Sequence, residues 1–204
     1  MRLAAVLTDK IALGTSTQET SSPLRHSLIV RVTHWLNMVT FLALVISGAA
    51  ILLAHPRLYW GETGAFGSPA LIELPLPLNM DQSGWGRSLH FLSAWVCVLN
   101  GTLYVLSGLR ARHFKMAEYE VLQRRTYLIV VFALFPLMIV TGLAMSPAVT
   151  SVLPIFVGIF GGHQSARTIH FVVTNLLVLF LIAHVAMVFL TGFKSQMRGM
   201  IKGL

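Results

Sequence analysis

The stretch TIHFVVTNLLVLFLIAHVAMVFLTGF, residues 168–193, contains no Asp, Glu, Lys or Arg and carries two histidines, His170 and His184. Because a membrane-spanning helix needs about 20 predominantly apolar residues, this stretch predicts one. The second histidine follows the first by fourteen residues. At about 100° and about 1.5 Å per residue, its side chain returns to within roughly 40° of the first, about 21 Å further along the helix. One helix face therefore carries two imidazoles, one near each side of the bilayer core.

The composition is that of a membrane protein. Of 204 residues, 55% are apolar and 11% are charged, and the mean hydropathy is +0.75, far from the values of an average soluble domain. We predict an all-α, four-helix transmembrane bundle in residues 25–204, after a flexible cytoplasmic tail in residues 1–24 that lacks the apolar core of a signal peptide. The four spans are predicted at about residues 32–54, 88–109, 126–146 and 168–193.

Positive charge is distributed unevenly along the chain. The formal net charge is +8, yet of 15 Lys and Arg only Arg57, Arg87 and Arg167 fall on one side of the four-span arrangement. The other twelve lie in both tails and the middle loop. By the positive-inside rule, we expect both termini to be cytoplasmic, and we interpret the basic residues as a topology signal and not as a nucleic-acid-binding surface.

Depth in the membrane pairs four histidines. The first span runs outward with His34 near its start, at the inner level, and the second runs inward with His90 near its start, at the outer level. The last span also runs inward, which places His170 at the outer level and His184 at the inner level. We therefore expect His34 opposite His184, and His90 opposite His170.

Such pairs match the ligands of haem iron. Neutral imidazole suits iron, and helical bundles build cofactor sites in their cores. Two histidines fill both axial positions, so such a haem transfers electrons and has no vacancy for oxygen. We predict two stacked haems; a zinc site or a proton relay is the alternative, and neither accounts for two pairs at two depths. The single cysteine, Cys97, and the lack of a Cys-x-x-Cys-His motif exclude an internal disulfide, covalent c-type haem and cysteine-ligated iron–sulfur clusters.

Three of the four histidines follow an arginine at the same spacing. Arg31, Arg87 and Arg167 each precede a histidine by three residues, so each shares a helix face with that histidine and lies about one turn closer to water. A guanidinium there is suited to binding a haem propionate. The alternative role is an interfacial arginine that snorkels from a helix end.

Two glycines lie on the same helix faces as ligand candidates. Gly48 follows His34 by fourteen residues and Gly101 follows His90 by eleven, so each is expected at the opposite haem level. Their missing side chains would admit a flat porphyrin, but small residues equally mark close helix–helix contact in membranes.

The two outer loops are the least ordinary connections. The first, residues 55–87, is long and rich in Pro, Gly and aromatic residues, which is typical either of an interfacial cap or of a docking surface for a soluble partner. In the second, the apolar run 148–160 is too short to span and predicts an interfacial or re-entrant segment. The remaining histidines are expected to be solvated in tails or loops: His26, His55, His113 and His163.

Three elements of this sequence are shared with a known family: Arg-x-x-His-Trp-Leu at residues 31–36, His90 at the start of the second span, and the fourteen-residue histidine spacing in the last. On these the chain resembles the bacterial cytochrome b561 family, the four-helix di-haem cytochromes b that serve as membrane subunits of formate dehydrogenases, nickel–iron hydrogenases and thiosulfate reductases. The resemblance extends from about Arg25 to Arg198. Residues 55–64, HPRLYWGETG, are most similar to the thiosulfate-reductase branch.

The resemblance implies a bacterial inner-membrane protein with two b-type haems that carries electrons between quinone and a periplasmic oxidoreductase, often a molybdopterin enzyme. In relatives the quinone site lies near the inner haem, where this chain offers candidate donors to a quinone carbonyl: Asn37, Arg124, Arg125 and Tyr127. For the two arginines, positive-inside anchoring is the alternative role. Because the chain has no nucleophile or molybdenum motif, we expect substrate chemistry in the partner.

Two other functions are compatible with parts of the sequence. A stand-alone cytochrome b would oxidise quinol and pass electrons to a small acceptor such as superoxide. A proton or ion transporter would use the histidines as a relay, but it needs polar residues along a continuous path. The middle of these spans has few polar residues, with Asn100, Thr141 and Asn175 the main exceptions. This scarcity disfavours a transporter.

Overall fold

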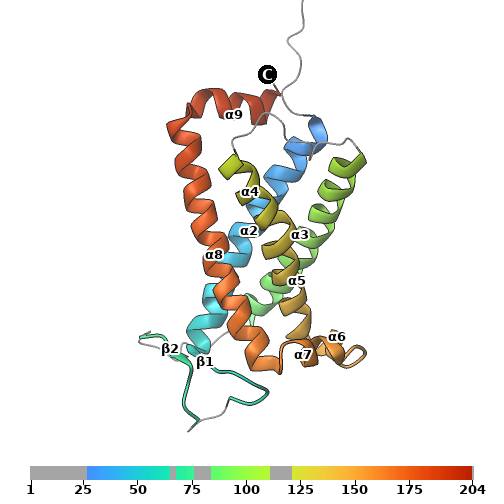
Figure 1. Ribbon diagram of the computed structural model, residues 1–204, viewed down its shortest axis with the longest axis vertical. Coiled ribbons are helices and arrows are strands. Elements are labelled where there is room, and N and C mark those ends of the chain that lie inside the picture. Colours follow the sequence, from blue (N-terminus) through green and yellow to red (C-terminus); the bar gives the residue numbers. More distant parts are fainter. Residues whose placement is uncertain (1–26, 65–67, 76–83, 111–120, 204) are drawn as a thin grey trace, which may run out of the picture.

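The computed structural model describes residues 27–64, 68–75, 84–110 and 121–203, except the side chains of residues 121–124. Within them, four helical segments are long and apolar enough to cross a membrane, and each overlaps a predicted span (Figure 1). They are α2 (Leu28–Ala54), α3 (Trp85–Arg110), a third segment formed by α4 (Val121–Ile129), η1 (Val130–Leu134) and α5 (Phe135–Ala144), and α8 (His163–Leu190). The predicted tail, residues 1–24, and the histidines His26 and His113 lie outside the described residues.

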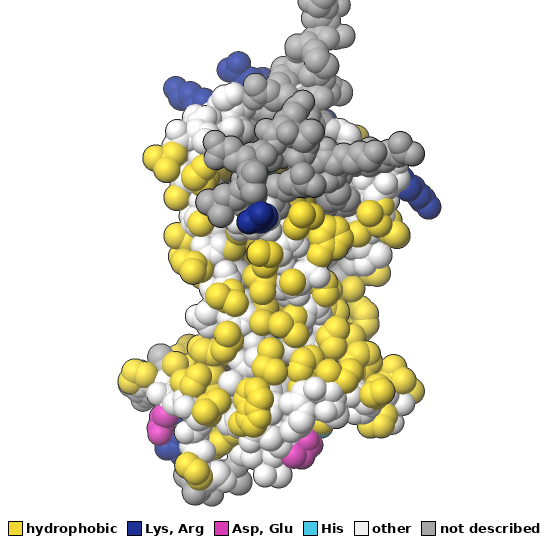
Figure 2. Space-filling model, in the orientation of Figure 1, with side chains coloured by type: hydrophobic (Ala, Val, Ile, Leu, Met, Phe, Trp, Pro, Cys, Tyr) yellow, Lys and Arg dark blue, Asp and Glu magenta, His cyan; other side chains and the backbone are white. Residues whose placement is uncertain are grey.

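The outside of the bundle is apolar around its middle. Figure 2 shows hydrophobic side chains over the waist of the face in view, Lys and Arg gathered at the end where α9 (Phe193–Lys202) lies, and acidic side chains at the opposite end. Large side chains such as Leu99 and Leu190 expose 67% and 81% of their surface. An apolar belt of this size suits lipid and not water, so the fold is that of an integral membrane protein.

Small and polar residues repeat every seven positions along α2 and α3, where these two helices pack together. Seven residues make nearly two helical turns, so each set lies on one face. Small side chains on such a face let two backbones approach closely within a membrane. The buried members are Thr33, Thr40 and Ser47 on α2 and Gly86, Ser93 and Asn100 on α3.

The third span contains a π-helical segment, η1, which the sequence analysis did not predict. It ends just before Pro136, which has no N–H to donate and whose ring crowds the carbonyl four residues earlier. A locally widened helix accommodates that proline. Val130, the first residue of η1, packs with Val173 and Leu177 of α8 in the buried apolar core of the bundle.

The first outer loop contains a short hairpin that was not expected. Strands β1 (Arg57–Leu58) and β2 (Ile72–Glu73) pair antiparallel, and Nη2 of Arg57 lies 2.8 Å from Oε1 of Glu73. The second outer loop forms two short helices, α6 (Pro147–Thr150) and α7 (Ile155–Ile159), neither long enough to cross a membrane.

The chain turns sharply after the last span. The helix ends at Leu190, and Gly192, with φ +104°, redirects the backbone into α9, which lies across the end of the bundle (Figure 1). A short basic tail had been expected here. Nη1 of Arg31 donates to the carbonyl of Ile201 at 2.7 Å and Nε1 of Trp35 to that of Met200 at 3.1 Å, so two side chains of α2 hold the last turn of α9.

Asn100 is the main polar link between α2 and α3. Its side chain is 4% exposed, and its Nδ2 donates to the carbonyl of Thr33 and to Oδ1 of Asn37, both at 2.7 Å. An Asn100→Leu substitution should therefore lower the unfolding free energy in detergent by about 1–2 kcal/mol, the range of interhelical hydrogen bonds in membranes. Asn175→Leu is the matched control, because within the described residues the exposed Asn175 bonds the Phe171 carbonyl of its own helix, at 2.8 Å, and no other helix. Equal losses in both variants would contradict a linking role for Asn100.

Candidate functional site

The structure brings the four intramembrane histidines together as two pairs. The ring centres of His34 and His184 are 6.3 Å apart with an interplanar angle of 51°, and those of His90 and His170 are 6.3 Å apart at 61°. Helix α8 contributes to both pairs because fourteen residues are nearly four full turns. His34, His90 and His170 are partly buried, and His184 is exposed.

The separation within each pair suits two imidazoles on one metal. Since a metal–nitrogen bond to imidazole is about 2 Å long and the ring centre lies roughly 1 Å behind the nitrogen, two rings on opposite sides of one metal have centres about 6 Å apart. Among the residues that the structure describes, no group of three or more His, Cys, Asp or Glu side chains is placed to hold a metal ion. Zinc needs three or four protein ligands, whereas haem iron needs two. The residues present therefore fit haem.

Apolar residues separate the two pairs. Leu177 lies seven residues from each histidine of α8 and shares their face. It is 2% exposed and packs with Val130 and Val173. This buried apolar cluster thus lies between the two histidine levels and separates the two pairs.

The outer pair, His90 and His170, is held by hydroxyl groups that sequence reasoning missed. Nδ1 of His90 lies 3.0 Å from Oγ of Ser47, and Nδ1 of His170 lies 2.9 Å from Oγ1 of Thr141. Thr141 was noticed only as a rare polar residue in a span without histidine. That rarity was the available signal, because a polar side chain inside lipid needs a partner.

Glycines lie beside the outer rings. A Cβ built on Gly48 would lie 3.5 Å from Cε1 of His90, and one on Gly142 would lie 3.7 Å from Cε1 of His170. Gly48 is thus at the outer level, on the face where the sequence placed it, while Gly142 was not anticipated. A Cβ on Gly101 would meet none of the described atoms within 4 Å, and its place beside a haem stays a prediction.

Aromatic rings flank the inner pair, His34 and His184. Trp35 lies edge-on to His34 with ring centres 5.6 Å apart, and Phe180 stacks on His184 at 6.0 Å. Trp35 also reaches α9, so the helix that crosses the end of the bundle is joined to the residue next to His34.

The three arginines predicted to bind propionates have different surroundings. Arg31 donates to the last turn of α9. Arg167 donates to the carbonyls of Arg57, at 3.2 Å, and His55, and Arg87 is exposed. Partial burial, together with the guanidinium groups of Arg167 and Arg87, lowers the pKa of His55, just outside the first span. Two of the arginines thus bind backbone carbonyls, a role that the sequence did not indicate, and propionate contact stays a prediction.

Further hydrogen bonds fasten the outer loop to the first turns of α8. Oγ1 of Thr168 donates to the carbonyl of Tyr59 at 2.6 Å, and the amide of Gly61 donates to Oγ of Ser165 at 2.7 Å. Gly162 has φ +131°, and any Cβ there would clash with the backbone of Gly61. The loop therefore lies against the helix that carries both His170 and His184.

Comparison with known proteins decides the family. Residues 25–203 match the sequence profile described as prokaryotic cytochrome b561. The chain belongs to the prokaryotic cytochrome b561 family. It is also 30% identical over 193 residues, covering 80% of this chain and 89% of the relative, to the "Putative protein-methionine-sulfoxide reductase subunit YedZ1" of Azospira oryzae. No solved structure matches the chain significantly. Membership implies b-type haem, electron transport and a place among oxidoreductase subunits, while the thiosulfate-reductase branch stays a prediction.

The candidate quinone donors of this cytochrome b561 contact the half of α3 that was predicted to lie toward the cytoplasm. Asn37 accepts a hydrogen bond from Asn100, and the hydroxyl of Tyr127 is bonded to that of Tyr104. Asn100 and Tyr104 are one turn apart on α3, so both contacts fall on one face of that helix. Arg125 is exposed. The side chain of Arg124 lies outside the described residues.

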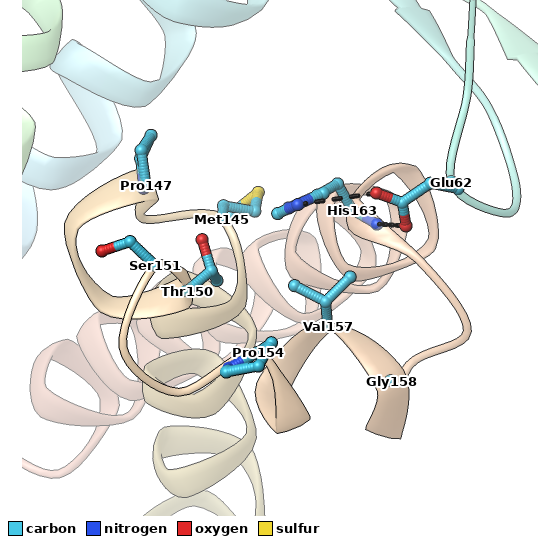
Figure 3. A pocket seen from close by; sticks show the side chains of 9 residues that line it. All are labelled: Glu62, Met145, Pro147, Thr150, Ser151, Pro154, Val157, Gly158 and His163. Carbon is cyan, nitrogen blue, oxygen red and sulfur yellow. Dashed lines mark hydrogen bonds and ion pairs between the residues drawn. The ribbon is translucent and has the colours of Figure 1, made fainter.

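A surface groove of about 590 Å³ opens at the outer end of this cytochrome b561, between the end of α5, α6, α7 and the start of α8 (Figure 3). His163, expected in a solvated loop, is instead the half-buried first residue of α8. Its Nε2 lies 3.6 Å from Oε1 of Glu62 and its Nδ1 lies 2.9 Å from the carbonyl of Ala144. The groove lies two turns of α8, roughly 10 Å, outside His170, separate from both histidine pairs.

An Arg167→Lys variant tests what this arginine holds. Lysine keeps the charge but lacks the planar fork that reaches two carbonyls. Because a hydrogen bond from a charged group contributes about 1.5 kcal/mol or more, we expect backbone amides of residues 57–64 to exchange with deuterium at least about tenfold faster. The exposed Arg87 provides the control, since Arg87→Lys should leave that exchange unchanged. If Arg167→Lys leaves the loop unaffected and instead shifts a haem midpoint potential, propionate contact is its main role.

Proposed function

We propose that this chain is a di-haem cytochrome b subunit that transfers electrons between the quinone pool and an oxidoreductase partner on the outer side of the bacterial inner membrane. One haem would be held by His34 and His184 and the other by His90 and His170. The observation that carries the proposal is the 6.3 Å separation of the ring centres in both pairs. When bound, each haem supplies a one-electron carrier.

In this function the protein would hold the two haems and enclose them within the helix bundle. With two histidines to hold each haem, the iron would have no vacancy for oxygen, so the site would serve electron transfer. Leu177 and its apolar neighbours keep the two centres apart. The fourteen-residue spacing on α8 would put one centre near each side of the membrane, about 21 Å apart along the helix axis, so the two centres together would span much of the lipid core.

The relative suggests the direction of transfer and the kind of partner. Its printed name makes it a subunit of a protein-methionine-sulfoxide reductase, and we extend a reductase partner of that kind, with a molybdopterin centre, to this chain. Oxidation of one quinol releases two electrons and two protons, and reduction of one sulfoxide consumes two electrons and two protons and releases water. Electrons would therefore leave quinol near the inner pair and reach the partner through the outer pair.

The inner half of α3 supports the placement of quinone. Asn37 and Tyr127, predicted as donors to a quinone carbonyl, both contact α3, at Asn100 and Tyr104. We add Tyr104 to the candidates because its hydroxyl shares a hydrogen bond with that of Tyr127. Arg125 is exposed and available either to quinone or to lipid headgroups. The outer loops, including the Arg57–Leu58 hairpin strand, form the proposed docking surface for the partner, with both termini in the cytoplasm.

Single histidine substitutions test this assignment. His184→Ala should remove the inner haem alone and halve the haem per chain, because each haem depends on two axial ligands. His90→Ala should remove the outer haem and abolish electron delivery to the partner while quinone still reduces the inner haem. Haem content by pyridine haemochrome and reduced-minus-oxidised spectra are the measurements.

His163→Ala is the matched control, since His163 lies on α8 outside both pairs and should leave both haems in place. Two haems retained in His184→Ala would contradict the ligand assignment, and a haem-free wild-type protein from a haem-replete host would contradict the function itself.

A further inference from the structure

Each histidine of the outer pair contacts a hydroxyl group on a neighbouring helix. Neither of those two helices supplies a histidine to the outer pair. Ser47 of α2 lies 3.0 Å from Nδ1 of His90 on α3, and Thr141 of α5 lies 2.9 Å from Nδ1 of His170 on α8. Both hydroxyl-bearing residues are fully buried, at 0% exposure. The two contacts are therefore shielded from water and have no competing solvent partner.

Each of the two hydroxyls has a single hydrogen and lies within hydrogen-bond distance of a carbonyl of its own helix. Oγ of Ser47 donates to the carbonyl of Ala43 at 2.6 Å, and Oγ1 of Thr141 donates to that of Leu137 at 2.8 Å. With its one hydrogen used in this way, each oxygen can accept a hydrogen bond from Nδ1–H of the histidine. A neutral imidazole protonated on Nδ1 carries its lone pair on Nε2. This arrangement favours, for both outer rings, the tautomer that presents Nε2 to a metal.

The bond to the carbonyl four residues earlier is ordinary behaviour for a hydroxyl in a membrane helix. Thr33 and Thr40, on the same face of α2 as Ser47, make it to Ile29 and Leu36 at 2.7 and 2.9 Å. What distinguishes Ser47 and Thr141 is the additional histidine nitrogen. Helix geometry alone explains the first bond but not the second.

A glycine follows each of these hydroxyls. Ser47-Gly48 and Thr141-Gly142 place a hydroxyl at Nδ1 and a bare backbone near Cε1 of the same ring. A Cβ at either glycine would be in ordinary van der Waals contact with the ring, and a larger side chain would press on it. Two unrelated helices thus present the same hydroxyl-glycine dipeptide to the two outer histidines.

We propose that Ser47 and Thr141 are positioning residues that fix the tautomer and ring orientation of both axial ligands of the outer haem and thereby lower its midpoint potential. A hydrogen bond accepted from the far ring nitrogen makes the ligating nitrogen more basic, which favours the ferric state. This inference rests on the proposed haem assignment and adds residues that tune one centre relative to the other.

The test uses the purified full-length protein with its haem as isolated, and Thr141→Val as the main variant. Valine keeps the shape of threonine and removes the hydroxyl, so folding and packing should survive. Titration in a His184→Ala background, where only the outer haem is expected, assigns the potential to that centre. Since loss of such a partner commonly changes metal-site behaviour 10–100-fold, we expect about a tenfold shift toward the ferrous state, an upward shift of about 59 mV for one electron.

Three companion variants separate tuning from packing. Thr141→Ser retains the hydroxyl and should restore the wild-type potential, Ser47→Ala should raise the potential as Thr141→Val does, and Thr40→Val removes a buried hydroxyl of α2 and should leave it unchanged. Loss of the outer haem in Thr141→Val with recovery in Thr141→Ser would also support positioning. Equal potentials in Thr141→Val and Thr40→Val, or haem loss in both Thr141 variants, would overturn it. A haem-free wild type contradicts the proposed function, whereas a haem-loaded wild type with an unshifted Thr141→Val contradicts only this inference.

Discussion

A polar side chain inside lipid has no water to bond, so it must find a partner within the protein, and this requirement organises the bundle. Asn100 meets it by bonding α2, and Ser47 and Thr141 meet it through their own helix and a histidine ring. Most of the remaining helix surface is apolar and exposed. The helices are thus located relative to one another by a few polar contacts, and the histidines are among the groups that make them.

Helix α8 is the axis about which both candidate centres are arranged. Because its inner face repeats every seven residues, His170, Leu177 and His184 lie in one line. Leu177 joins the apolar core, so buried apolar side chains lie between the two histidine levels. Each histidine of α8 then has one partner from another helix. His34 of α2 faces His184, and His90 of α3 faces His170.

Hydropathy and histidine spacing predicted the four spans and which rings face each other, since length in lipid and helical period are local properties. That these rings bind haem stays a prediction. The β1–β2 hairpin had no signal, because two-residue strands show no periodicity. The π-helical segment was missed because Pro136 alone does not tell a kink from a widened turn. Thr141 and His170, which are in contact, lie 29 positions apart in the sequence. The helical period predicts which face of its helix Thr141 lies on, but not which side chain of another helix it contacts.

The attachment of the outer loop to α8 has a mechanical consequence. Tyr59 and Gly61 are bonded to Thr168 and Ser165, within the first two turns of the helix that ends beyond His184. A helix is stiff along its length. A force that a bound protein applied to the loop would therefore be transmitted to α8. His170 lies two residues beyond Thr168, so such a force would reach the helix beside a ring of the outer pair.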